Sequence, residues 1–233
     1  MNWLILIEVI VLLIIKNIKC NEDTCDLDNN PCYCERYTRV LKCYSSDLLI
    51  KNHLNYSLHD KNNLKVTALL YSGFVNFPPS LLLQRYKNLK MLTIKATRTN
   101  KIPQFAFEEL NSLQYISVGD SNITRIEAKA FHNLLTLRWI FVQHNLIREI
   151  HADAFYNLPQ VEKISLENNQ IAELHNGTFA ELKNLKKIIL LGNPLRKLQQ
   201  NLFGINFVNF LTEESYLTFY IGNLFIKFSL KYY

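Results

Sequence analysis

The stretch LRWIFVQHNLIREIHADAFYNL, residues 137–158, begins as an apolar strand and places an asparagine, Asn145, where that strand would end. Side chains in a strand alternate between its two faces, so Ile140 and Val142 are predicted to be buried while Trp139 and Phe141 face outward. The same arrangement returns every 24 residues along the chain. A fixed period of this length is typical of a solenoid, in which each unit buries its apolar face against its neighbours.

Five units share this pattern without slippage, and each position within a unit is called a slot. Slots four, six and fourteen are apolar in every unit, and slot nineteen is always phenylalanine. The units begin at Leu89, Leu113, Leu137, Val161 and Leu185, and their phenylalanines are Phe107, Phe131, Phe155, Phe179 and Phe203. These slots are predicted to form one continuous core.

The consensus L-x-x-L-x-L-x-x-N-x-L resembles the extracellular leucine-rich repeat family. The resemblance implies an α/β-type solenoid shaped as a curved horseshoe. Its parallel sheet would line the concave side, and irregular or short helical segments would form the convex side. A weaker unit at 64–88 reads as one residue longer than the others, so we expect about six repeats over residues 64–206.

Slot nine lies where each unit leaves the sheet and where backbone groups lose their strand partners. An asparagine amide both donates and accepts hydrogen bonds, so it can satisfy these groups. We expect a structural ladder formed by Asn145, Asn169 and Asn193, with Ser72, Thr97 and Ser121 taking its place upstream. Slot eight should face solvent, so the substitution Asn168→Ala is expected to be nearly silent.

The N-terminal region predicts secretion. Residues 3–15 form an apolar run too short for a standard membrane-spanning helix, and a signal peptide over residues 1–20 is expected. All five cysteines lie within the first 43 residues, and cleavage after Cys20 would remove the odd one. The remaining four, Cys25, Cys32, Cys34 and Cys43, allow three pairings.

Residues 21–63 resemble the cysteine-rich N-terminal cap of extracellular leucine-rich repeat proteins. The resemblance implies the pairs Cys25–Cys34 and Cys32–Cys43. A zinc site is less favoured, because no C-x2-C pair is present. Such a cap would cover the sheet edge and core that the first coil of a solenoid exposes.

Three N-x-S/T triplets also fit secretion and predict glycosylation at Asn55, Asn122 and Asn176. The formal net charge is +6, without a dense basic tract, so we do not expect nucleic acid as a partner. Membrane association of this chain is not expected either. A modestly basic surface is compatible with acidic proteins or anionic glycans.

Catalytic motifs are missing from the sequence. It contains no G-x-S-x-G, G-x-G-x-x-G, P-loop or H-E-x-x-H pattern. His151 and His175 are one repeat apart, but Gln199 takes their place in the next unit. We therefore expect no enzyme activity, no metal site and no cofactor.

The outward slots three, five and seven predict a ligand-binding surface on the concave side. Its proposed members are Tyr115, Trp139, Phe141, Lys163 and Glu167. Grouped exposed aromatic residues mark interaction sites. We expect a secreted protein-binding module that recognises a protein or a glycan. The alternatives are a matrix or adhesion component that self-assembles, for instance as a homodimer, and a truncated receptor ectodomain.

The last segment, residues 207–233, is rich in aromatic residues and contains no cysteine. We interpret it as a C-terminal cap without disulfides, in which aromatic side chains cover the last coil. The residues proposed for this role are Phe207, Phe210, Tyr216, Phe219 and Phe225. The alternative is that the tail packs poorly because the chain is a truncated or alternatively spliced product.

Overall fold

The computed structural model describes residues 32–35, 40–44, 67–73, 76–78, 80–84, 86–195, 201–203, 217–221 and 224–228. The predicted signal peptide, most of the N-terminal segment, Asn55 and Cys25 lie outside these residues, as do Phe207, Phe210 and Tyr216. Among the described residues, no helix is long and apolar enough to cross a membrane.

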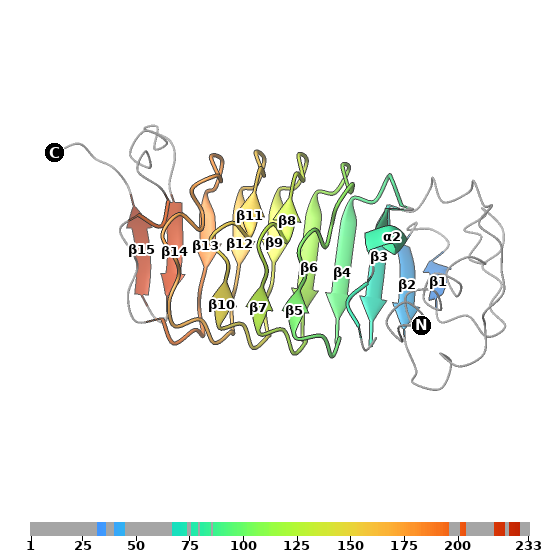
Figure 1. The fold of residues 1–233 in the computed structure, drawn as a ribbon, viewed down its shortest axis with the longest axis horizontal. Coiled ribbons are helices and arrows are strands. Elements are labelled where there is room, and N and C mark those ends of the chain that lie inside the picture. Colours follow the sequence, from blue (N-terminus) through green and yellow to red (C-terminus); the bar gives the residue numbers. More distant parts are fainter. Residues whose placement is uncertain are drawn as a thin grey trace.

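The chain is a solenoid of stacked coils, as the repeat predicts. Each coil contributes one strand to a ten-stranded sheet, and the strands lie side by side along the length of the molecule (Figure 1). The repeat strands are parallel and in register, so that Ile140 lies beside Ile116 on one side and Ile164 on the other. These strands are β3 (Ala68–Ser72), β4 (Met91–Lys95), β6 (Tyr115–Gly119), β9 (Trp139–Phe141), β12 (Lys163–Ser165) and β13 (Lys187–Ile189).

The opposite side of the coils carries short elements and turns. Three two-residue strands pair in a second small sheet, and two more pair in a third (Figure 1). They are β5 (Lys101–Ile102), β7 (Arg125–Ile126) and β10 (Glu149–Ile150), and then β8 (Phe131–His132) and β11 (Phe155–Tyr156). One short helix, α2 (Ser80–Leu83), lies in the first coil.

The core is confirmed in the described residues. The slot-four and slot-six side chains of the five regular coils are completely buried. Slot nineteen forms a row of phenylalanine rings whose neighbouring centroids lie 5.1–5.9 Å apart, from Phe107 through Phe131, Phe155 and Phe179 to Phe203. Phe77 extends the row, with its ring centroid 5.6 Å from that of Phe107. Aromatic pairs at these distances add to the free energy gained from burial.

The first coil is displaced from its predicted register. Leu69 pairs with Leu92 and Tyr71 with Ile94, so the step to the next coil is one residue shorter than the regular repeat. The expectation of a longer unit was therefore wrong, and Ser72 lies beside Lys95 in slot seven instead of slot nine. The pattern was misread because Tyr71 fills a core slot. It is 1% exposed, and burial raises the pKa of its hydroxyl far above the usual value.

The slot-nine side chains form hydrogen bonds with the backbone of the turns that follow the strands. Asn169 Nδ2 donates to the carbonyl oxygens of Val142, Leu166 and Glu167 at 2.7–3.2 Å. Its Oδ1 accepts the backbone N–H of Ile147 at 3.1 Å.

Asn193 repeats this pattern one coil later, with Nδ2 donating to Leu166 O and Oδ1 accepting the Ile171 N–H. One amide thus joins two successive coils.

The ladder is less complete upstream. Asn145 Nδ2 donates to Val118 O at 2.9 Å, but its Oδ1 is buried without a hydrogen-bond partner among the described residues. In the preceding coil, the Ser121 hydroxyl accepts the Thr97 N–H and donates to Gly119 O. A hydroxyl supplies a single donor, so it binds fewer backbone groups than an amide.

Slot eight is exposed but conformationally special. Its residues have left-handed φ angles between 50° and 70°, and they are Ala96, Asp120, His144, Asn168 and Gly192. A left-handed conformation costs about 1–2 kcal/mol for most residues, and asparagine and glycine tolerate it best. A Cβ on Gly192 would also collide with Asn168 Oδ1. Slot eight faces solvent as expected, but a φ of 52° favours asparagine over alanine, so Asn168→Ala is now expected to cost some stability.

Antiparallel strands close both ends of the sheet. At one end, β1 (Cys32–Glu35) pairs antiparallel with β2 (Val40–Tyr44), which continues parallel into β3. At the other, β14 (Leu217–Ile221) extends the parallel array from β13, and β15 (Leu224–Phe228) pairs antiparallel with it. The register places Phe219 beside Ile188, in the slot-four column, with Ile226 rather than Phe225 opposite Phe219.

We predict that Asn169→Leu lowers the free energy of unfolding by about 1–3 kcal/mol, because it leaves buried backbone groups unpaired. Denaturant titration measures the loss. The matched control is Asn168→Gly, which keeps the left-handed conformation and should change stability by less than about 0.5 kcal/mol. Equal losses in the two variants would contradict the ladder.

We also predict a disulfide between Cys32 and Cys43. The two residues are direct Cα partners in the antiparallel pair, and such partners lie about 4.5–5.5 Å apart, within the range that a disulfide requires. Mass spectrometry of the unreduced protein, expressed through a eukaryotic secretory pathway, should identify this pair. Replacing both residues with alanine should cost about 2–5 kcal/mol. A Cys32–Cys34 or Cys34–Cys43 bridge would contradict the register.

Candidate functional site

The outer face of the ten-stranded sheet, formed by slots three, five and seven and here called the strand wall, carries most of the predicted site residues. Tyr115, Trp139 and Lys163 are register partners in slot three. Phe141 lies in slot five, with Ser117 and Ser165 as its partners. Because the alternating residues fill the core, the backbone directs these side chains outward.

Two of the aromatic residues of the strand wall are in contact with each other. The rings of Tyr115 and Phe141 have centroids 5.2 Å apart and are inclined by 34°. Lys163 Nζ lies 4.7 Å above the centroid of Phe141, and Arg138 Cζ lies 5.1 Å from that of Trp139. Trp139 is 36% exposed, and Met91, which also lies in slot three, is 47% exposed. The structure thus combines a cluster of rings with cations that stabilise their outer faces.

A charged row borders this cluster in slot two. Glu162 accepts from Arg138 Nε at 3.1 Å and lies 3.7 Å from Lys186 Nζ. The hydrogen bond from Arg138 holds the pKa of the Glu162 carboxyl below its usual range, with the charge of Lys186 also contributing. The Glu162 side chain is therefore ionised at neutral pH and fixes the guanidinium beside Trp139.

Glu167 occupies slot seven, at the end of the strand wall where the chain turns away. Its backbone carbonyl accepts from His144 N–H and from Asn169 Nδ2, so this residue is held by the slot-nine ladder. It is half-buried and lies two residues beyond Ser165 on the same face. The structure therefore places Glu167 at the rim of the wall and Tyr115, Trp139, Phe141 and Lys163 at its centre.

Sequence reasoning missed two serines beneath the aromatic cluster. Ser117 and Ser165 are 8% and 1% exposed, although their slot faces outward. Ser165 Oγ is buried without a hydrogen-bond partner in the described part of the chain. One indication of this burial was present in the sequence: Ser165 is a small residue whose slot-five neighbours, Phe141 and Ile189, are large.

The two described sequons lie away from the strand wall. Asn122 and Asn176 are both exposed, in slots ten and sixteen. Their hydroxyl residues bind backbone carbonyls, with Thr124 Oγ1 donating to Asn100 O and Thr178 Oγ1 to His175 O. Glycans at these positions would leave the strand wall accessible.

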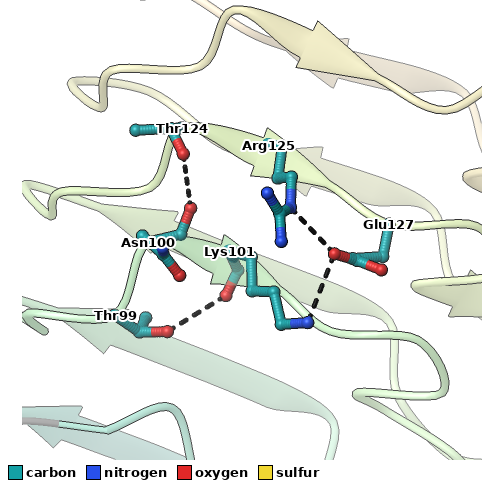
Figure 2. Close-up of polar contacts among 6 residues, drawn as sticks. All are labelled: Thr99, Asn100, Lys101, Thr124, Arg125 and Glu127. Carbon is teal, nitrogen blue, oxygen red and sulfur yellow. Dashed lines mark hydrogen bonds and ion pairs between the residues drawn. The ribbon is translucent and has the colours of Figure 1, made fainter.

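The side opposite the strand wall carries a separate polar network. Figure 2 shows Lys101 and Arg125, from neighbouring coils, converging on Glu127 Oε1 at 3.3 and 2.9 Å. The hydrogen bond from Arg125 lowers the pKa of the Glu127 carboxyl. The same view shows Thr124 bonded to Asn100. The Lys101–Glu127 and Thr124–Asn100 contacts run between adjacent coils, so they reinforce the stacking, whereas Arg125 and Glu127 lie on the same coil.

A second row of rings on this opposite side also escaped the sequence analysis. His132 stacks on Tyr156 at 5.7 Å and meets the edge of Phe105 at 5.3 Å. Tyr156 is 42% exposed. Among the described residues, no group of three potential metal ligands converges, and His151 Nδ1 accepts the Asp153 N–H.

The model for the BspA-type leucine-rich repeat region matches residues 84–226 in six copies. The chain belongs to this leucine-rich repeat family. The match spans the regular coils and β14 and ends within β15. No curated protein sequence matches the chain.

Solved structures of other leucine-rich repeat proteins have the same fold. The TLR13 chain of a complex with ssRNA13 is similar over 68% of this chain, with 26% identity and a TM-score of 0.54. The Drosophila Toll–Spatzle complex gives 23% identity over 60% of this chain and a TM-score of 0.53. A glycosylated form of the latter gives 22% identity over 62% and a TM-score of 0.55. The matched regions cover only 22%, 19% and 20% of those chains.

We predict that Trp139→Ala changes the free energy of unfolding by less than about 0.5 kcal/mol, because the ring lies on the surface of the leucine-rich repeat sheet. Its sequence neighbour provides the control. Ile140 is completely buried, so Ile140→Ala should cost about 2–5 kcal/mol. Thermal or denaturant unfolding measures both. A large loss for Trp139→Ala would show that the ring is structural.

Proposed function

We propose that this chain is a secreted, non-enzymatic module that binds a protein partner through the strand wall. The observation that carries the proposal is the cluster of Tyr115, Trp139 and Phe141 on a face that the fold does not use for its own core. Tryptophan and tyrosine dominate the binding energy of protein interfaces. Their position on a rigid sheet also reduces the entropy lost on binding.

Secretion is part of the proposal. The apolar run at residues 3–15, the cross-strand position of Cys32 and Cys43, and the exposed Asn122 and Asn176 are all features of an extracellular protein. We accordingly assign residues 1–20 to a signal peptide and 21–63 to an N-terminal cap. The repeats then occupy residues 64–206, and the tail at 207–233 adds the closing strands.

The proposed partner is a protein, with a glycan as the alternative ligand. We propose no nucleic acid, metal or cofactor, because the sequence has no dense basic tract and no phosphate-binding or metal-ligand motif. A complex with ssRNA13 is known for TLR13 and a complex with Spatzle for Toll. This chain spans about a fifth of the length of those proteins, so whether it binds either kind of ligand has to be tested by experiment.

Self-assembly as a matrix or adhesion component, and a role as part of a receptor ectodomain, are the alternative functions. Both would also use an exposed strand wall. Sedimentation of the purified protein separates self-assembly from recognition of another protein. A concentration-dependent dimer that Trp139→Ala abolishes would favour self-assembly.

The proposal predicts that Trp139→Ala weakens partner binding by about 30-fold, corresponding to the loss of one interface hot spot. The measurement is binding of the secreted protein to an array of purified extracellular proteins, followed by titration of each hit. Leu146→Ala is the matched control, since Leu146 is 40% exposed but lies in slot ten, outside the wall. It should leave affinity unchanged.

Two outcomes would contradict the proposal. One is that a genuine partner binds the Trp139→Ala and wild-type proteins equally. The other is that a single-stranded RNA oligonucleotide at physiological salt binds more tightly than any protein on the array.

A further inference from the structure

We propose that Lys163 and Ser165 form a subsite of the strand wall that binds the carboxylate of an acidic side chain from a protein partner. This inference rests on the proposed function, because it specifies which chemistry the strand wall recognises. The Ser165 hydroxyl has no hydrogen-bond partner among the described residues, Lys163 Nζ lies over the ring of Phe141, and Phe141 is the register partner of Ser165.

Ser165 is buried although its side chain belongs to the outward face of the sheet. It lies in the last position of β12, and its neighbours Ile164 and Leu166 are completely buried in the core. Alternation therefore directs the Ser165 side chain to the outer face of the sheet. Yet the residue is 1% exposed, and Oγ is buried without a hydrogen-bond partner among the described residues.

An unpaired buried hydroxyl destabilises a fold, since the group loses its hydrogen bonds to water and gains none. Alanine has nearly the same shape and would avoid that cost. Fold stability therefore gives no reason for a hydroxyl at this position. A ligand that accepts a hydrogen bond from Ser165 would supply the partner that the protein does not.

Lys163 provides the charge. It lies two residues before Ser165 on the same face, and its Nζ is held 4.7 Å above the ring of Phe141. Phe141 is in turn the register partner of Ser165 on the neighbouring strand. The ammonium group and the hydroxyl are therefore both placed beside Phe141.

Both groups donate hydrogen bonds, so the ligand atom they fit is an oxygen that accepts, and the lysine charge favours an anion. Nearby Glu162 is already bonded to Arg138 and Lys186.

The aromatic rings of the strand wall determine which kind of anion fits the subsite. Phe141, Tyr115 and Trp139 offer an apolar surface directly beside the two donors. An acidic side chain that follows or precedes a large apolar residue matches this combination. A sulfated glycan has no comparable hydrocarbon surface.

The subsite is tested with two small probes, N-acetyl-Glu-Phe-amide and N-acetyl-Gln-Phe-amide, titrated into the full secreted chain and followed by NMR. The two probes differ only in charge. We expect the glutamyl probe to bind about tenfold more tightly, as a charge-assisted hydrogen bond in place of a neutral one implies. Lys163→Met and Ser165→Ala should each reduce this preference to about twofold or less.

Lys95→Met is the matched control. Lys95 lies on the same wall but is bridged to Asp120 at 3.6 Å, so its removal should leave the preference unchanged. Thermal unfolding gives a second readout. Ser165→Ala should raise Tm by about 2–4 °C, because it removes an unpaired buried hydroxyl.

Four results would overturn the subsite. Equal affinity of the two probes would remove the role of charge, and a lower Tm for Ser165→Ala would show that the hydroxyl has an internal partner. Tighter binding of a heparin disaccharide than of the glutamyl probe would assign the site to a glycan. If neither probe binds while Trp139→Ala still weakens capture of a protein partner, the subsite fails and the proposed function stands.

Discussion

The structure depends on how each coil satisfies its backbone where the chain leaves the sheet. A parallel strand that ends in a buried turn leaves carbonyl and N–H groups that water cannot reach. Asn169 and Asn193 meet this constraint by joining the turn of one coil to the backbone of the coil before it. Where an asparagine fills slot nine, the same groups meet at the same place in successive coils, which fits the constant 24-residue step there, whereas the step from β3 to β4 is one residue shorter. The rows of core side chains and the phenylalanine row follow from that fixed length.

The fixed repeat also creates the strand wall. Once slots four and six are committed to the core, slots three and five must face outward, and they form straight columns across the sheet. Residues distant in sequence, such as Tyr115 and Lys163, are thereby placed on opposite sides of Trp139. A flexible loop would not hold such a group in one geometry. The scaffold thus orders a surface before any partner arrives, which favours recognition of another molecule over catalysis.

Stability and recognition place opposite demands on this surface. On the side opposite the strand wall, charged side chains are paired, and Glu127 links its own coil to the preceding one through Lys101. On the strand wall, Lys163 instead lies over a ring, and the Ser165 hydroxyl is unpaired. A polar group without a hydrogen-bond partner in the fold is stabilised most when a ligand supplies that partner. This difference supports the proposal that the strand wall is the binding surface.

The sequence by itself determined the solenoid, its repeat length and its core, because these depend on a local alternation that recurs identically in every regular coil. It also placed Trp139 and Phe141 on the outward face, since a strand has only two faces. The tertiary structure alone decided the register of the first coil, where buried Tyr71 takes a slot that the pattern assigns to an aliphatic residue. It likewise decided the left-handed conformation of slot eight, the antiparallel strands at both ends and the burial of Ser165. Those features depend on which side chains meet across neighbouring coils, and no local pattern in one coil records what lies beside it.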